Sequence, residues 1–365
     1  MGVGFVLSLQ TLFAAGTAAG TTISNTANAD FTVGGAQQTT ATSTTTFKVD
    51  RKVIFTLTRN NSDHIAASPG YGFSGVAPAV ASYTLTNQSN DVLDFDLAVV
   101  NGAKPAQSGS NFAGTANNNA TGLIARYDQA ASGTYNSTTD TKAYVDELAA
   151  DASTTVFVVA SFALTGFANG DIAGVNLTAT ASLGGTSGSL GAHLTNDAGN
   201  ADAPGTVQNL FAELSGDGGD SNYDGTISVL NSFKINAASI SVNKQSYIVT
   251  DPINCTTAGL ASSCTVGSNP KRVPGSVVLY EIIVTNAAGA STANATTVTD
   301  PIPTNTVYKA GSMQTDTGSG YAADDDGTST GVADYNITNA GKVTAAFGSV
   351  AAGATKKVKF QVTVQ

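Results

Sequence analysis

Apolar and polar residues alternate in short runs along much of this chain. The clearest run begins after a turn at Pro274-Gly275 and ends at Asn286. Its apolar residues largely alternate: Val278, Tyr280, Ile282 and Val284. Period-two alternation bounded by turn residues is typical of half-buried strands. With the β-rich run that closes before Pro303, this region predicts neighbouring strands of a β-sandwich.

The same arrangement recurs nearer the N-terminus. Pro78 is followed by the sequence YTLTN at residues 83–87, which mirrors Tyr280 and the VTN that ends at Asn286. A module that recurs along a chain indicates repeated domains of one architecture. We therefore predict a first β-sandwich domain with long loops over 47–236 and a second β-sandwich domain over 237–365.

Two segments carry other signals. In residues 140–153, Tyr144, Val145 and Leu148 would lie on one side of a helix that begins at Asp140, so we expect a helix there. Three lysines lie on the final strand: Lys356, Lys357 and Lys359. Lysine commonly protects an edge strand from unwanted pairing, so these residues predict an edge. A role in binding a partner is the alternative.

The N-terminal region differs from the rest of the chain. Residues 1–15 are apolar and end in small residues, which is typical of a signal peptide whose positively charged start is missing. The alternative is a retained segment that is buried in a neighbouring subunit. Residues 16–46 are rich in Thr and Ala and predict an extended arm with one or two weak strands. We expect its sizeable apolar residues, Ile23, Phe31 and Val33, to contact another subunit.

Composition favours a protein that packs against copies of itself outside the cell. Charged residues make up 12% of the 365 residues, roughly half the usual share. Thr, Ser, Ala, Asn and Gly take their place and give an uncharged but polar surface. The net charge of −10 argues against a nucleic-acid partner, because phosphate binding needs a basic face. The apolar N-terminal segment is too short to span a bilayer, so we expect no membrane span.

Cys255 and Cys264 are the two cysteines of the chain. An even, minimal count at short spacing predicts one disulfide in an oxidising compartment. Two free thiols are the alternative. A metal site would need further Cys or His nearby.

A ligand site is suggested by the sequence DSNYDGTISVLN. Asp220, Asn222 and Asp224 match the alternating oxygen ligands at the start of a calcium loop. The twelfth position holds Asn231 in place of the bidentate Glu, and no helix is expected to follow. Calcium at these three residues is therefore one interpretation, with Asp217 as a compensating carboxylate, and a polar turn between strands is the other.

Catalytic chemistry has little support in the sequence. His64 and His193 are the two histidines, and both fall in predicted loops with no partner suggested by spacing. The chain has no phosphate-binding glycine loop, no CxxC and no HExxH. We expect a protein that is not an enzyme and that needs no cofactor. A secreted hydrolase with its catalytic part in the first region is a rival that no motif supports.

The pattern of Pro274-Gly275, Tyr280, the VTN at Asn286 and the TDPIP that ends at Pro303 resembles the DUF11 family of surface-protein repeats. The N-terminal sequence AGTAAGTTISNTA is similar to the N-termini of proteobacterial proteins that contain this domain. The resemblance implies Ig-like β-sandwich modules that build extracellular structures and perform no chemistry.

We therefore expect an all-β protein with tandem Ig-like β-sandwiches and an extended N-terminal arm, located outside the cell or on its surface. The function we expect is a structural subunit of an exported assembly, a pilus-like filament joined by addition of the arm to a neighbour's sheet. The alternative is an adhesin or matrix-binding module that contacts other cells or matrix, with calcium as a possible requirement.

Overall fold

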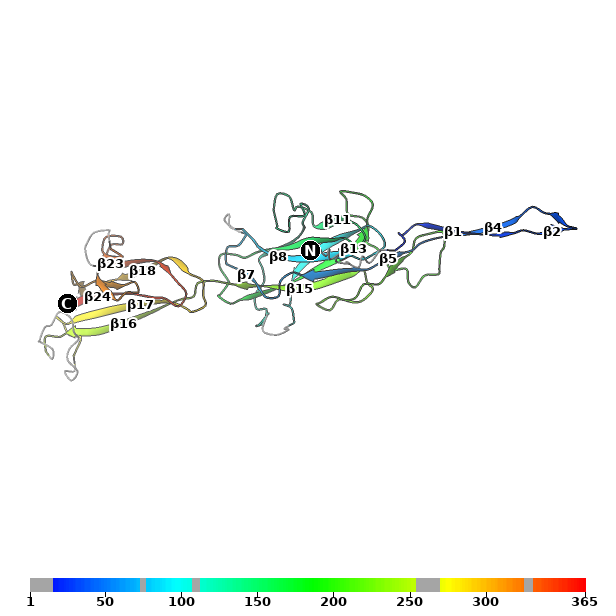
Figure 1. Cartoon of the computed structure of the whole chain (residues 1–365). Helices are drawn as coiled ribbons and strands as arrows, with labels where there is room; N and C mark the ends of the chain where they lie inside the picture. The colour runs from blue at the N-terminus through cyan, green and yellow to red at the C-terminus, as the bar shows by residue number, and fades with distance from the viewer. Residues whose placement is uncertain (1–15, 73–76, 107–111, 254–269, 325–330) are drawn as a thin grey trace, which may run out of the picture. The chain divides into compact units, whose positions relative to one another are not determined.

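The chain folds into two compact units that contain β-strands as their regular elements (Figure 1). The computed structural model describes residues 16–72, 77–106, 112–253, 270–324 and 331–365. The first unit comprises Met1–Phe167 and Asp171–Ile235, and the second comprises Ala168–Gly170 and Asn236–Gln365. Each unit is a sandwich of two sheets, so the predicted all-β fold with two β-sandwiches in tandem is confirmed.

The first unit places a four-stranded sheet against a five-stranded sheet. The four-stranded sheet has the order β10 (Gly122–Tyr127), β12 (Ser153–Ser161), β8 (Ala79–Asn87) and β6 (Phe55–Arg59). The five-stranded sheet has the order β11 (Tyr144–Leu148), β9 (Leu93–Asn101), β13 (Ile172–Leu183), β15 (Thr226–Ile235) and β7 (Ile65–Ala67). A parallel pair, β5 (Arg51–Val53) with β14 (Asn209–Phe211), completes the unit.

Alternation explains how these strands build a core. Along β8, every second side chain from Ala79 to Asn87 is buried, and the side chains between them are partly exposed. Tyr83 and Leu85 are fully buried. The rings of Phe55 and Phe95, which come from opposite sheets, lie 4.9 Å apart between centroids. Burial of each such side chain stabilises the sandwich by roughly 1.5–3 kcal/mol.

The second unit has the same layered construction. Its larger sheet has the order β16 (Ile240–Thr250), β17 (Val277–Asn286), β24 (Thr355–Val364), β20 (Gln314–Asp316) and β21 (Tyr321–Ala323), with β19 (Thr306–Tyr308) also beside β24. The facing sheet has the order β18 (Ala293–Pro301), β23 (Lys342–Val350) and β22 (Ala333–Tyr335). The alternating run predicted after Gly275 is β17, and its side chains Val278, Ile282 and Val284 lie in the core.

The N-terminal arm is a β-hairpin. β1 (Thr22–Ala29) pairs with β4 (Ala41–Lys48) in antiparallel register, and the short strands β2 (Thr32–Val33) and β3 (Ala36–Gln37) form the tip. Gly34 and Gly35 make the turn with φ angles of 61° and 87°, values that glycine adopts without strain. The arm therefore pairs with itself, whereas the sequence predicted one or two weak strands.

The predicted helix over 140–153 is wrong. The segment forms β11, which pairs with β9 through Val145 opposite Phe95 and Leu148 opposite Leu93. Three positions on β11 therefore span two on β9, which defines a β-bulge. Glu147 lies in this bulge with a φ of 55°. The extra residue gives Val145 and Leu148 a helix-like spacing of three while both side chains still face the core.

The predicted edge position of the final strand is also wrong. β24 pairs with β17 along one side and with β19 and β20 along the other, so it lies inside the sheet. Lys359 has a different role, because its ammonium lies 3.8 Å from the centroid of the Tyr321 ring. Such a cation–π contact contributes about 0.5–1 kcal/mol at an exposed site.

Candidate functional site

The hairpin of β1 and β4 has two chemically different faces. Side chains on a strand alternate between faces, and residues directly opposite each other share one. The first face, here called the apolar hairpin face, carries Ile23, Ala27, Ala29, Ala41 and Phe47, with Asn25, Ser43 and Thr45 among them. The second face is entirely polar and carries Thr22, Ser24, Thr26, Asn28, Thr42, Thr44, Thr46 and Lys48.

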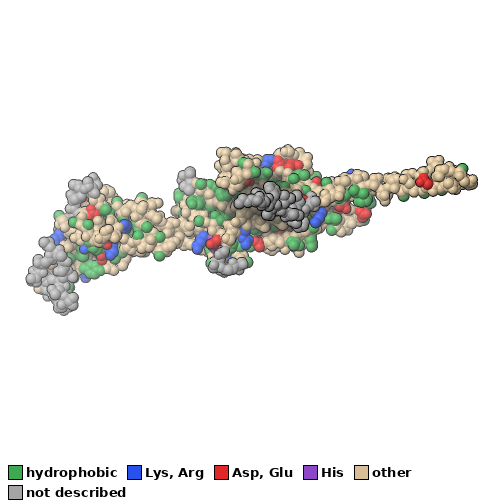
Figure 2. All heavy atoms as spheres, in the orientation of Figure 1, with side chains coloured by type: hydrophobic (Ala, Val, Ile, Leu, Met, Phe, Trp, Pro, Cys, Tyr) green, Lys and Arg blue, Asp and Glu red, His purple; other side chains and the backbone are tan. Residues whose placement is uncertain are grey.

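The rest of the described chain covers neither face. Every residue of β1 and β4 is exposed, and Ile23 and its cross-strand neighbour Phe47 are 37% and 49% exposed. On the polar face, the hydroxyls of Thr26 and Thr44 form a hydrogen bond of 2.9 Å. Figure 2 shows the hairpin surface as mostly uncharged. The hairpin thus offers apolar side chains to solvent with little charge around them.

The three predicted contact residues all lie on this arm but do not form one cluster. Ile23 lies near the base of the hairpin, whereas Phe31 and Val33 lie near its tip. Phe31 and Val33 are 48% and 62% exposed. Phe47 was not among the predicted contact residues, because the arm was expected to end at residue 46. Its aromatic side chain at the end of a Thr run was the signal that could have identified it.

The predicted calcium residues lie in a loop whose oxygens accept hydrogen bonds from the protein itself. Asp220 accepts from the backbone N–H groups of Gly216 at 2.7 Å and Ser228 at 3.2 Å. Asn222 accepts from a backbone N–H at 2.6 Å, and Asp224 accepts from one at 3.0 Å. These bonds suit the alternative of a polar turn before β15. Calcium at this loop stays a prediction, and a calcium titration followed by thermal unfolding tests it.

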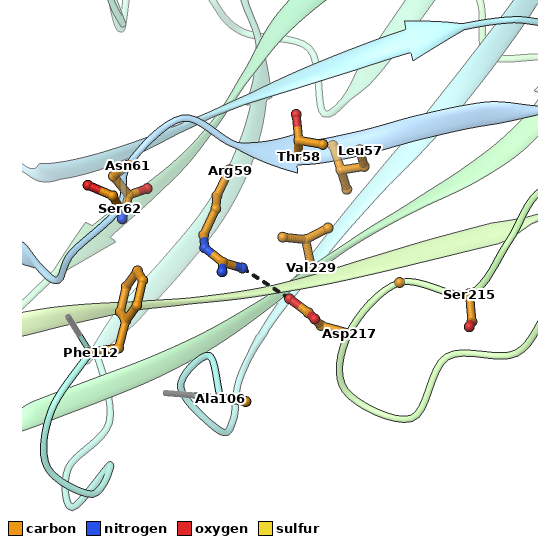
Figure 3. Close-up of a pocket in the computed structure, with 11 residues that line it drawn as sticks. Leu57, Thr58, Arg59, Asn61, Ser62, Ala106, Phe112, Ser215, Asp217 and Val229 are labelled. Carbon is orange, nitrogen blue, oxygen red and sulfur yellow. Dashed lines mark hydrogen bonds and ion pairs between the residues drawn. The ribbon is translucent and has the colours of Figure 1, made fainter. Parts of the chain in front are cut away.

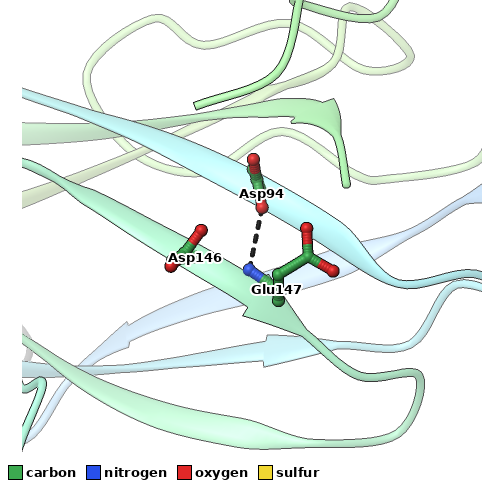
Figure 4. Close-up of side chains that lie close together, drawn as sticks. All are labelled: Asp94, Asp146 and Glu147. Atoms are coloured by element: carbon green, nitrogen blue, oxygen red, sulfur yellow. Dashed lines mark hydrogen bonds between the residues drawn. The ribbon is translucent and has the colours of Figure 1, made fainter. Parts of the chain in front are cut away.

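Asp94, Asp146 and Glu147 bring their carboxylates within 4.8 Å of one another (Figure 4). Asp94 is fully buried and accepts backbone N–H bonds from Glu147 at 2.8 Å and Gly191 at 2.9 Å. Asp146 forms an ion pair of 2.7 Å with Lys142, and this hydrogen bond raises the pKa of Lys142. The bonds of Asp94 stabilise the β11 bulge at Glu147 and the loop that contains Gly191, so we assign the cluster a structural role.

A cavity of about 650 Å³ lies between β6, β15 and the loop around Asp217 (Figure 3). Arg59 forms an ion pair of 3.2 Å with Asp217 across it, and the Arg59 guanidinium lies 5.2 Å from the ring centroid of Phe112. The other polar side chains of the lining are small: Thr58, Asn61, Ser62 and Ser215. Among the residues that the structure describes, the lining includes neither histidine nor cysteine, and we assign no chemistry to it.

The histidines do not form a catalytic triad with described residues. A ring nitrogen of His64 is 2.8 Å from the hydroxyl of Ser232, but Ser232 is fully buried and the other nitrogen contacts the Ala113 carbonyl at 3.0 Å. A triad needs an accessible nucleophile and an acid beside the base. His193 contacts Asp96 at 3.2 Å. The predicted disulfide of Cys255 and Cys264 lies outside the described residues.

Comparisons with known proteins give little guidance. No family model matches the chain, and no curated protein matches it. Among solved structures, it is similar to the class 5 fimbriae chaperone CfaA, with 9% identity, a TM-score of 0.24, and coverage of 82% of this chain and 84% of that one. It is also similar to BspA_C_mut, with 8% identity, a TM-score of 0.31, and coverage of 86% and 90%.

Within the residues that the structure describes, no helix has the length and hydropathy that a membrane crossing requires.

Proposed function

We propose that this protein is a structural subunit of an exported cell-surface or extracellular assembly, a filament whose copies join through the N-terminal hairpin. The apolar hairpin face carries this proposal. Its largest side chains, Ile23 and Phe47, are opposite each other and open to solvent. Contact with another copy would remove them from water, which is the main favourable term in protein association.

The low stability expected of an isolated hairpin supports the same proposal. An isolated two-stranded hairpin is marginal in water, and a third strand or a packing surface is needed to hold it. Among the described residues, backbone hydrogen bonds link the hairpin to the rest of the first unit near its base, where the N–H of Ala19 donates to the Asn90 carbonyl at 3.1 Å and the N–H of Lys48 donates to the Pro204 carbonyl at 2.8 Å. A neighbouring subunit would supply the missing surface.

Addition of another strand would also provide hydrogen-bond partners for the backbone groups of β1 that point away from β4. The N–H of Val49 donates to the Thr21 carbonyl at 2.9 Å, so odd-numbered residues of β1 point their backbone groups at β4. The even-numbered residues point theirs outward and have no backbone partner among the described residues: Thr22, Ser24, Thr26 and Asn28. Addition of this edge to another sheet joins chains through main-chain hydrogen bonds. A head-to-tail contact of this type propagates into a fibre when it does not close.

Composition and resemblance agree with a structural rather than a catalytic role. The surface is poor in charge, and the DUF11-like pattern around Pro274 implies modules that build extracellular structures. An adhesin or matrix-binding role remains the alternative proposal. It would be favoured by a protein that stays monomeric and binds a partner in a calcium-dependent manner.

The proposal is tested by altering one hairpin face at a time. The double variant Ile23→Ser, Phe47→Ser removes the large side chains of the apolar face. The matched control, Thr26→Ala with Thr44→Ala, alters an opposed pair on the polar face. Sedimentation velocity should show assembly by the control and monomers for the first variant, while both keep the thermal unfolding of the parent because these side chains lie outside the core. Unchanged assembly of the first variant would contradict the proposal.

A further inference from the structure

The first strand of the second unit, β16, is an open sheet edge. Among the described residues it pairs with β17 alone. Its first eight residues are all exposed, which is unusual for a strand in a sandwich. Val242 is 61% exposed and Ile240 is 41% exposed. Long edges with exposed apolar side chains are ready templates for pairing with another chain.

The backbone groups along this edge are available. The N–H of Ala287 donates to the Ser239 carbonyl at 2.9 Å, so the odd-numbered residues of β16 point their backbone groups at β17. The even-numbered residues point theirs away from the sheet. In the described part of the chain, no backbone hydrogen bond outside the pairing with β17 involves Ile240, Val242, Lys244 or Ser246.

The side chains of these even-numbered residues point toward the interior of the sandwich. Val242 lies opposite Val284, and Lys244 lies opposite Ile282; both partners belong to the core. The facing sheet nevertheless leaves Val242 uncovered. Lys244 is held by Asp300 of β18 at 2.7 Å, and its ammonium lies 4.5 Å from the Tyr280 ring centroid. Its charge is therefore paired within the unit, and apolar side chains remain open beside it.

We propose that β16 is the acceptor for β1 of a second copy, which adds to this sheet in parallel orientation. This inference rests on the proposed function and names the surface that the hairpin would contact. The two segments agree in length, since β1 has eight residues and the exposed part of β16 has eight. Because β1 belongs to the first unit and β16 to the second, the contact joins unlike surfaces and propagates along a fibre.

The orientation follows from the two faces of each strand. In a parallel pair, a residue whose backbone points at the partner lies beside a residue whose backbone points away, and their side chains share a face. Parallel addition therefore places Ile23 and Ala27 on the interior side with Val242. It places the polar side chains of β1 beside Ser241 and Asn243 on the outer side. Antiparallel addition would reverse this match and leave the apolar hairpin face on the outer, polar surface.

Crosslinking between copies tests the contact. A photoreactive phenylalanine replaces Val242 in full-length protein, unlabelled and isotope-labelled copies are mixed and assembled, and crosslinked peptides are identified by mass spectrometry. We expect crosslinks between position 242 of one copy and residues 22–29 of another. Assembled material with crosslinks elsewhere, or between two copies of position 242, would overturn this inference but not assembly through the hairpin. Protein that does not assemble would overturn both.

Paired variants give an independent readout. Val242→Glu places a charge on the interior side of the edge, and the matched control Asn243→Glu places it on the outer side; both positions are exposed, so both variants should fold. We expect the first to raise the concentration needed for assembly on the order of tenfold or more, equivalent to about 1.4 kcal/mol, and the second to leave it near the parent value. If both variants raised the concentration needed for assembly equally, the assignment of β16 as the acceptor would be overturned.

Proline variants of the hairpin test the donor strand. Thr26→Pro removes an outward N–H of β1 and should raise the concentration needed for assembly, as Val242→Glu should. Thr44→Pro alters β4 and should permit assembly.

Discussion

Asn87 and Asn286 occupy the same structural position in the two units. Each is fully buried at the end of a strand, β8 or β17. The Asn87 amide donates to the carbonyls of Asp91 and Leu148, both at 2.9 Å. The Asn286 amide donates to Ser291 at 2.8 Å and Val350 at 2.9 Å. The repeat in the sequence therefore reflects one arrangement, in which a buried asparagine links its strand end to the turn that follows and to the last residue of another strand, Leu148 of β11 or Val350 of β23.

Replacement of either asparagine by alanine should destabilise its own unit. The change leaves buried carbonyl groups without donors, and it also removes the acceptor for Ser89 N–H or Ser239 N–H, each bonded at 3.0 Å. We expect a loss of about 3 kcal/mol of unfolding free energy. Hydrogen exchange in denaturant should show early opening of β8 for Asn87→Ala and of β17 for Asn286→Ala. Asn243→Ala, on an exposed position, is the control, and simultaneous loss of both units in either variant would contradict this account.

Tyr83 should make the first unit sensitive to alkaline pH. Burial raises the pKa of Tyr83 above its ordinary value of 10.0, and the nearby Asn231 and Arg59 lower it by less. Because the folded-state pKa is raised, the contribution to stability is fully present below pH 10.0 and declines above it. The decline should be about 1.4 kcal/mol per pH unit.

The variant Tyr83→Phe should lose this dependence. The Tyr83 hydroxyl is buried and interacts with the Asn231 side chain, so its removal should change stability by about 1 kcal/mol at neutral pH. Denaturant unfolding of the parent and the variant at several pH values on either side of pH 10.0 measures both effects. If the unfolding free energy of the two proteins changed equally with pH, the role given to Tyr83 would be refuted.

Asp94 should stabilise the first unit without a metal ion. Asp94→Ala leaves the N–H groups of Glu147 and Gly191 without their acceptor, and we expect a loss of about 3 kcal/mol. Asp96→Ala, which removes a surface contact with His193, should cost less than about 0.5 kcal/mol. Thermal unfolding of both variants with and without a chelator checks this. A chelator that destabilises the parent but not Asp94→Ala would show instead that the cluster binds metal.

Strong period-two patterns were enough to predict much of the fold. The alternation that ends at Asn87 and the alternation that ends at Asn286 became β8 and β17, and their similarity indicated two related sandwiches. The segment of β11 was mispredicted because a bulge at Glu147 imitates helical spacing. The place of β24 inside its sheet depends on β19 and β20, which are three residues each and too short to leave a pattern.

The candidate site was predicted only in outline. The arm and its exposed Ile23, Phe31 and Val33 followed from composition, but the hairpin did not, although Gly34-Gly35 is a turn signal between two polar strands. The apolar hairpin face depends on the register that places Phe47 opposite Ile23. The open edge of β16 could not be predicted, because exposure of a strand depends on how far the facing sheet extends.

Negative-stain electron microscopy of the purified chain, beside a variant in which two glycines replace Thr22 to Lys48, tests the central claim most directly. The hairpin ends are adjacent, since Thr22 lies opposite Lys48, so this excision should leave the sandwiches intact. The account predicts filaments from the full chain and none from the folded variant. Filaments from the variant, or none from the full chain, would contradict it.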